Sequence, residues 1–263
     1  MDQPVVHPVV HPVVHPVHRT RIKICGLTRA QDVAAAVQAG ADALGFVFYP
    51  KSPRYLTPAR AGALMALVPP FVSTVALFVN AGVDQVRAVA AEAPFMQMQF
   101  HGDETPAQCA AIAQAVGRPF VRVFRVKPDT SPADLLEYES QYRAASSLFS
   151  GLLLDTFVDA YGGAGKVFDW SLIPKELAPR VVLSGGLSVH GATDAVVRVR
   201  PYAVDVSSGV EESKGIKSAR KIAAFVAAVR AADSSVGTSS DTTLYSETSN
   251  DQSDRDQTDP GSA

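Results

Sequence analysis

Five short segments of this 263-residue chain end an apolar run with reactive side chains or with glycines. They are residues 23–26 (KICG), 99–102 (QFHG), 152–155 (LLLD), 183–187 (LSGGL) and 205–211 (DVSSGVE). Their thiol, imidazole and carboxyl groups could transfer protons, and their serine–glycine turns could bind a phosphate. Chemistry placed where strands end is typical of a (β/α)8 barrel, whose active sites lie at the carboxyl ends of its strands.

Cys25 is the first candidate for proton transfer. Gly26 follows it, and Thr28 with Gln31 predicts a capping box at the start of a helix. A thiol near a helix N-terminus gains from the dipole, and Lys23 shares its strand face. Both effects predict a lowered pKa for the Cys25 thiol. The alternative is a buried structural cysteine, and the spacing alone does not decide between them.

Asp155 is the second candidate, because it follows three consecutive leucines. A carboxyl group that leaves so apolar a run is poorly solvated unless it faces a polar opening. Poor solvation favours the protonated form, which a general acid needs near neutral pH. The alternative is an aspartate that begins a loop and accepts hydrogen bonds from the backbone.

Two serine–glycine turns are candidates for a phosphate site. The residues concerned are Gly185 and Gly186 in one turn and Ser207, Ser208 and Gly209 in the other. Glycines let the backbone approach an anion, and successive N–H groups at a helix start form an anion-binding nest. One such turn is a weak signal, but barrels often bind phosphate in the loops after strands seven and eight.

Strand-like and helix-like patterns alternate along the chain. The strands are expected at 21–25, 43–48, 74–79, 95–100, 120–126, 152–154, 181–183 and 203–206. Helices are expected at 29–39, 84–92, 106–116, 132–145 and 218–230. A further helix is expected after the second strand and its loop, and it ends at residue 67. Alternation predicts a parallel sheet, and eight units predict closure into a single α/β barrel. A doubly wound open sheet is the competitor, although no GxGxxG follows the first strand.

Composition sets the limits of the domain and of its partners. The barrel is expected over residues 20–231, between a Pro-Val-Val-His repeat at 1–19 and a polar segment at 232–263. Both ends are predicted to be disordered, and a metal site at His7, His11, His15 and His18 is the less favoured reading. The net charge is −2, and no apolar run approaches the roughly 18 residues of a membrane span. We therefore expect no nucleic-acid or membrane partner, and the two widely spaced cysteines indicate the cytoplasm.

The motif set resembles that of the phosphoribosylanthranilate isomerase family of tryptophan synthesis, over about residues 21 to 230. The resemblance implies a TIM barrel that performs an Amadori rearrangement, with Cys25 as general base and Asp155 as general acid. It also implies that Arg54 binds the anthranilate carboxylate and that His101 contributes to the substrate site. It implies a phosphorylated small-molecule substrate, no metal or organic cofactor, and a monomer or homodimer.

The sequence departs from the family pattern at two positions. Phe100 stands where the family has leucine, and Ala164 replaces a serine or threonine in the glycine-rich loop at 162–166. The contact of that hydroxyl is therefore missing here. Asp169 and Trp170 follow this loop in the expected place.

Three other functions compete with this one. The histidine-pathway isomerase performs the same rearrangement, but it has an aspartate where this chain has Cys25. Indole-glycerol-phosphate synthase uses lysines at strand ends, for which only Lys127 is comparable here. A redox- or metal-responsive binding protein would use Cys25 together with the histidine-rich end.

Overall fold

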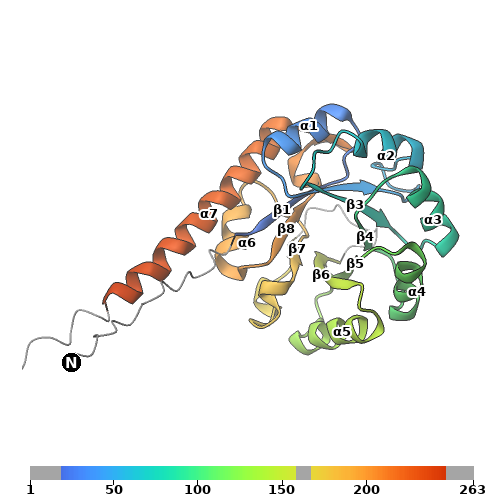
Figure 1. The fold of residues 1–263 in the computed structure, drawn as a ribbon. Helices are drawn as coiled ribbons and strands as arrows, with labels where there is room; N and C mark the ends of the chain where they lie inside the picture. Colours follow the sequence, from blue (N-terminus) through green and yellow to red (C-terminus); the bar gives the residue numbers. More distant parts are fainter. Residues whose placement is uncertain (1–18, 158–166, 247–263) are drawn as a thin grey trace, which may run out of the picture.

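The computed structural model describes residues 19–157 and 167–246, with side chains described as far as residue 235. Eight parallel strands form a closed barrel in the order β1 to β8, and β8 pairs with β1 through Arg21 and Ala203 (Figure 1). The strands are β1 (Arg21–Cys25), β2 (Ala43–Val47), β3 (Ser73–Phe78), β4 (Gln97–Phe100), β5 (Phe120–Val126), β6 (Phe149–Thr156), β7 (Val182–Leu183) and β8 (Ala203–Val206). The predicted barrel is confirmed, and the open sheet was the wrong alternative.

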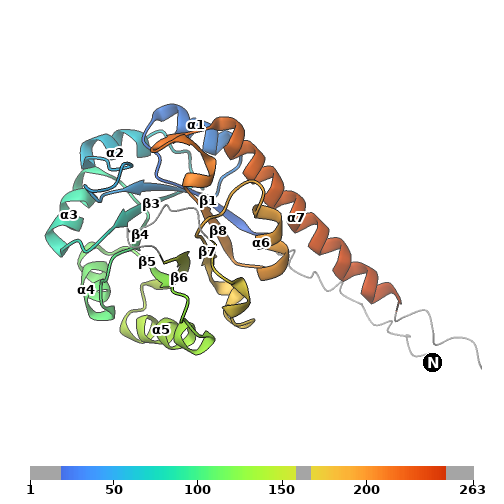
Figure 2. The same ribbon diagram turned by 180° about the vertical axis from the view of Figure 1, so that it is seen from behind.

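Helices surround the barrel (Figures 1 and 2). They are α1 (Ala30–Gln38), α2 (Pro58–Met65), α3 (Val83–Glu92), α4 (Pro106–Val116), α5 (Pro132–Ala145), α6 (Ala192–Val199) and α7 (Ala219–Ser246). In the described part of the connection from β6 to β7, two short 3-10 helices, η1 (Trp170–Leu172) and η2 (Ala178–Arg180), take the place of an α-helix. In the described residues, seven α-helices therefore accompany the eight strands of the barrel.

Side-chain caps explain where three of the helices begin. Thr57, Thr105 and Ser131 cap α2, α4 and α5, each with a proline in the first turn. Helix α1 differs, because Arg29 is its N-cap residue and makes no side-chain cap bond. The predicted capping box of Thr28 and Gln31 is therefore wrong. The Thr28 hydroxyl instead donates a 2.6 Å bond to the carbonyl of Gly215, which no local pattern could show.

Helix α7 continues beyond the expected end of the domain and projects from the barrel (Figure 1). The backbone N–H and the hydroxyl of Thr20 both donate to the Asp233 carboxylate, and Arg230 donates to the Thr20 carbonyl. These bonds tie the start of β1 to α7. The boundary expected after residue 231 therefore lies inside a helix that runs to Ser246.

A row of phenylalanine rings lines the face of the sheet that packs against the helices. Phe48, Phe78, Phe100, Phe120 and Phe149 follow one another around the barrel, with neighbouring ring centres 5.5 to 6.4 Å apart. All five belong to the large apolar core. The Phe100 departure from the family pattern thus enlarges this core and does not alter the barrel mouth.

Candidate active site

Cys25 ends β1 and packs inside the barrel against Val47 and Leu77. Lys23, on the same strand face, donates a 2.9 Å bond from Nζ to the Asp205 carboxylate of β8. Gly45 of β2 makes room for both side chains. A Cβ on Gly45 would lie 2.8 Å from Cys25 Sγ and 3.2 Å from Lys23 Cε. Sequence reasoning missed Gly45, although a glycine inside a strand signals close approach of another group.

The predicted lowering of the Cys25 pKa is wrong. Burial raises the pKa of the thiol, Lys23 opposes this change, and Asp205 adds to it. Helix α1 begins at Ala30, five residues along the chain from Cys25. Burial lowers the pKa of Lys23, but Asp205 and Cys25 raise it by more, and the lysine stays protonated. The resting site is thus a neutral thiol above a charged lysine–aspartate pair.

Asp155 is the residue before the last of β6 and is buried. One carboxylate oxygen accepts a 2.8 Å bond from the N–H of Thr156, as the loop-start alternative required. The other oxygen lies 3.3 Å from Nε2 of His101, which follows β4. His101 Nδ1 lies 3.3 Å from the Gln99 side-chain amide. The structure therefore brings His101 and Asp155 together.

The two serine–glycine turns lie against each other. Gly185 and Gly186 both have left-handed backbones, with φ of 81° and 68°. A Cβ on Gly185 would lie 2.5 Å from the Thr156 hydroxyl, and one on Gly209 would lie 2.0 Å from the Leu187 carbonyl. Close packing therefore requires glycine at both 185 and 209.

The expected anion nest at a helix start differs in detail from what forms. Helix α6 begins only at Ala192, well after Gly186. Ser208 begins the three-residue 3-10 helix η3 (Ser208–Val210). In the turn after β7, two consecutive glycines with left-handed backbones set the course of the main chain. The N–H groups of this turn therefore do not belong to the start of a helix.

Arg54 lies in the loop after β2, and its side chain reaches Glu211, in the segment that follows β8. Its Nε and Nη2 donate bonds of 2.7 and 2.8 Å to the two carboxylate oxygens of Glu211. A Cβ on Gly26 would lie 2.3 Å from Arg54 Cδ, so this side chain packs beside the residue that follows Cys25. Glu211 is the last residue of the 205–211 segment, and nothing local showed that its partner would be Arg54.

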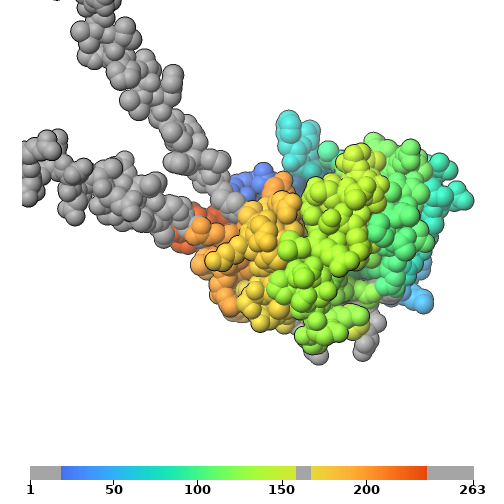
Figure 3. Space-filling view, turned by 90° about the horizontal axis from the view of Figure 1, so that it is seen from below, coloured from blue at the N-terminus to red at the C-terminus, as the bar shows by residue number. Residues whose placement is uncertain are grey.

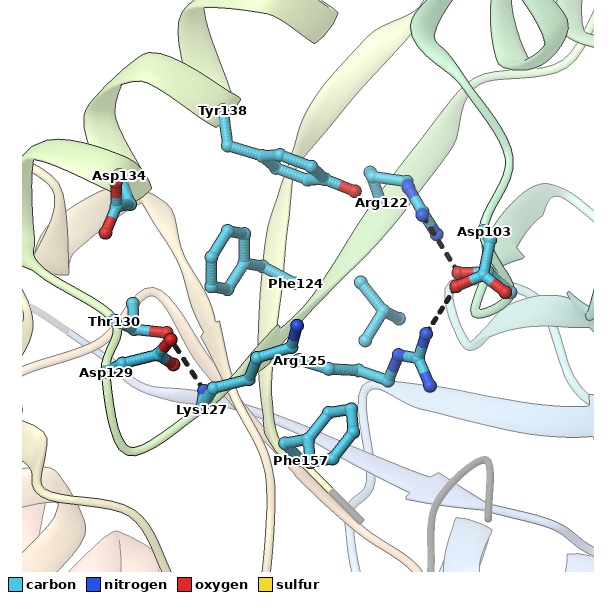
Figure 4. Close-up of a pocket in the computed structure, with 12 residues that line it drawn as sticks. Asp103, Arg122, Phe124, Arg125, Lys127, Asp129, Thr130, Asp134, Tyr138 and Phe157 are labelled. Atoms are coloured by element: carbon cyan, nitrogen blue, oxygen red, sulfur yellow. Dashed lines mark hydrogen bonds and ion pairs between the residues drawn. The ribbon is translucent and has the colours of Figure 1, made fainter. Parts of the chain in front are cut away.

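A cavity of about 330 Å³ opens beside the barrel mouth at β5 (Figure 4). Its wall includes Phe124, Tyr138 and Phe157, and the Lys127 ammonium lies 5.4 Å from the centre of the Phe157 ring. Neither Cys25 nor Asp155 lines it. Lys127 thus lines a cavity whose wall includes neither of the two candidate proton-transfer groups.

Some expectations fall on residues that the structure does not describe. These are the repeat with His7, His11, His15 and His18, the loop at 162–166 with Ala164, and residues 247–263. Among the described helices, none is both long enough and apolar enough to cross a membrane. No group of three or more His, Cys, Asp or Glu side chains in the described ranges could hold a metal ion.

Known proteins are similar to this chain in sequence and in fold. The family model of N-(5'phosphoribosyl)anthranilate (PRA) isomerase matches residues 22–228. The N-(5'-phosphoribosyl)anthranilate isomerase of Herminiimonas arsenicoxydans is 70% identical over 220 residues, which cover 84% of this chain and 97% of the relative.

Two solved structures show the same likeness. A form of the dimeric Thermotoga maritima isomerase, described as mutually generated monomers, has a TM-score of 0.68 at 36% identity, covering 81% of this chain and 99% of its own. A phosphoribosyl anthranilate isomerase in complex with reduced 1-(o-carboxyphenylamino)-1-deoxyribulose 5-phosphate has a TM-score of 0.68 at 37% identity, with the same coverage.

Proposed function

Because the chain belongs to the N-(5'-phosphoribosyl)anthranilate isomerase family, an aldose–ketose isomerase family of tryptophan synthesis, we propose that Cys25 and Asp155 are its two proton-transfer groups. The observation that carries this proposal is their placement in the closed barrel. They lie at the carboxyl ends of β1 and β6, with β7 and β8 between them. A sugar bound across the mouth would meet one group on each side.

The proposed reaction begins at Asp155. Its protonated carboxyl gives a proton to the furanose oxygen, the bond from that oxygen to C1′ breaks, and an iminium forms at the anthranilate nitrogen. Thr156 and His101 hold the carboxyl group during this step. The Cys25 thiolate then removes the proton from C2′, and the electron pair of that bond neutralises the iminium. The resulting enol tautomerises to the 1-deoxyribulose product.

Formation of the thiolate requires charge compensation, because burial raises the pKa of Cys25. The protonated Lys23 ammonium lies beside the sulfur and stabilises its negative charge. The positive iminium adds to this stabilisation at the moment when the base acts. The site thus favours a thiolate most strongly after the sugar ring has opened.

The substrate of this family has two anionic groups, a phosphate and a carboxylate. The serine–glycine turns and Arg54 are the two parts of the site that remain to bind them. The solved relative holds a ligand with a carboxyphenyl group and a 5-phosphate. We propose that the turns with Gly185, Gly186, Ser207, Ser208 and Gly209 bind the phosphate. The Arg54 guanidinium is suited to the carboxylate, because its planar fork can donate two parallel bonds.

Two substitutions test the proton-transfer groups. Cys25→Ala and Asp155→Asn should each lower kcat by at least about 100-fold, as expected for loss of a positioned acid or base. Cys109→Ala is the matched thiol control, because Cys109 lies on the buried face of α4, in the apolar core. Steady-state turnover of freshly made phosphoribosylanthranilate checks this, with circular dichroism to show that each variant is folded. Near wild-type turnover in either variant would exclude that residue.

We further propose that the chain forms a homodimer through the end of the barrel opposite the active site. Phe71 projects there fully exposed, with a left-handed backbone at φ 70°, in the loop between α2 and β3. This loop, in cyan, stands out from the surface in Figure 3. Beside it lies a broad hollow whose wall includes Met96 and Tyr202, both exposed. Exposed aromatic side chains beside a concave face are typical of interfaces.

We also propose that the enzyme acts in the cytoplasm. Cys25 and Cys109 are both free and buried, as is usual in a reducing compartment.

A further inference from the structure

A small antiparallel hairpin lies outside the barrel, between β8 and α7. It consists of β9 (Glu211–Ser213) and β10 (Ile216–Lys217). Glu211 and Lys217 face each other on it, with Nζ 2.9 Å from a carboxylate oxygen. The Lys217 side chain is completely buried and that of Glu211 is 6% exposed. A buried pair of this kind costs solvation energy, so its retention calls for a physical reason.

Each member of the pair also binds a different part of the proposed substrate site. Glu211 holds the Arg54 guanidinium through two hydrogen bonds. Lys217 Nζ donates bonds of 3.0 and 3.2 Å to the carbonyl and the hydroxyl of Ser207, in the proposed phosphate turn. An unbroken polar chain thus runs from Ser207 through Lys217 and Glu211 to Arg54.

The hairpin itself is anchored to the loops after β1 and β2. Gly215, at its tip, has φ of 80°, and a Cβ there would lie 2.9 Å from the Pro53 carbonyl. Thr28 donates to the Gly215 carbonyl, and the Lys217 N–H donates to the Asp32 carboxylate. The hairpin is therefore held between the loop that carries Arg54 and the start of α1.

The bonding leaves Arg54 able to receive a second carboxylate. A guanidinium has five N–H groups, and Glu211 uses one on Nε and one on Nη2. The opposite edge, formed by Nη1 and the other N–H of Nη2, has the same fork geometry. Burial raises the pKa of Glu211, but Arg54 and Lys217 lower it by more, so the supporting carboxylate stays ionised.

We propose that Glu211 and Lys217 are positioning residues that fix the span between Arg54 and the phosphate turn at Ser207. The enzyme then selects substrates whose carboxylate and phosphate are separated by that span. This inference rests on the proposed function, because it assigns the two ends of the polar chain to the two anionic groups of the substrate.

The test is Glu211→Gln, measured with the natural substrate and with an analogue that lacks the anthranilate carboxylate. The amide cannot hold the guanidinium as an ionised partner does. KM for the natural substrate should rise about tenfold, the lower end for loss of a charge-assisted bond, while kcat stays within about twofold. KM for the analogue should stay within about twofold, since Arg54 does not contact it. Glu212→Gln is the matched control, because this neighbouring glutamate is exposed.

A companion variant, Lys217→Gln, tests the other end of the chain. It should weaken competitive inhibition by inorganic phosphate about tenfold by releasing Ser207, whereas Glu211→Gln should leave that inhibition within about twofold. Glu211→Asp retains the charge on a shorter side chain and should raise KM less than Glu211→Gln does. If Glu211→Gln does not fold, Glu211→Asp supplies the comparison, with KM rising for the natural substrate alone.

The inference is overturned if the variant that folds raises KM equally for the substrate and for the analogue. Failure of the proposed function would give a result that differs from this one. In that case the wild-type enzyme itself would not distinguish the substrate from the analogue, or would not be inhibited by phosphate.

Discussion

Burial and four side chains act on the protonation state of Cys25, and these side chains come from β1, β8, the hairpin of β9 and β10, and the loop after β2. Lys23 and Lys217 lower the pKa of the thiol, while burial and Asp205 raise it, and the net direction is upward. The Arg54 guanidinium also lies close enough to interact electrostatically with the sulfur. A thiol with a raised pKa is mostly neutral near pH 7, so the proposed role of Cys25 as a base would use the small fraction of thiolate.

This balance predicts the pH dependence of the reaction. Because thiolate is the proposed active form, kcat/KM should rise as pH rises through the alkaline range. Lys23→Gln removes the ammonium that favours thiolate and should move this rise to higher pH. Asp205→Asn removes the opposing carboxylate and should move it to lower pH. Profiles of kcat/KM against pH check both variants, and shifts of the two in the same direction would contradict the assignment.

At the scale of elements, loop contacts shape the proposed phosphate site. The turn after β7 packs on the end of β6 through Gly185, and the turn after β8 packs on the first turn through Gly209. Neighbouring parallel strands supply three adjoining loops at one end of the barrel. The proposed general acid Asp155 and the proposed phosphate turns are thus parts of one packed unit.

Gly209→Ala tests this unit. The added Cβ would lie 2.0 Å from the Leu187 carbonyl, so the two turns must separate. KM and the inhibition constant for phosphate should each rise at least about tenfold, with a smaller effect on kcat. Gly191→Ala is the control, because its Cβ would meet nothing within 4 Å. Unchanged phosphate inhibition in Gly209→Ala would place the phosphate elsewhere.

At the scale of the whole molecule, we propose different roles for the two ends of the barrel. The carboxyl ends of the strands carry Cys25, Asp155 and the serine–glycine turns. The amino ends carry the exposed Phe71, Met96 and Tyr202, with Arg21 lying 4.4 Å from the centre of the Tyr202 ring. A contact between two copies at the amino ends would leave both active sites open.

Phe71→Ser tests the proposed dimer. Loss of a central aromatic anchor costs about 2 kcal/mol or more of binding, so the dimer dissociation constant should rise at least about 30-fold. Sedimentation equilibrium measures this change, and kcat/KM under the same conditions should stay within about twofold of wild type. Val197→Ser on α6 is the control for an exposed apolar residue. A wild-type chain that sediments as a monomer would exclude the proposal.

The sequence by itself determined the barrel and the strand ends at which its candidate residues lie. Alternating apolar and helical patterns predicted β1, β5 and β8 and helices α4 and α5 at their observed bounds. Cys25, Asp155 and the glycine turns were found because each lies next to the apolar run that forms its strand. Such features depend on neighbours in the chain, which a sequence displays directly.

Only the tertiary structure decided how these groups are tuned and held. The pairs of Lys23 with Asp205 and of Arg54 with Glu211 join residues 182 and 157 positions apart. The cap of α1 was mispredicted because Gly215, from the distant hairpin, takes the Thr28 hydroxyl. The predicted fall in the Cys25 pKa became a rise because burial outweighs Lys23. Desolvation and ion pairing depend on the neighbours in space that folding supplies, and chain spacing does not specify them.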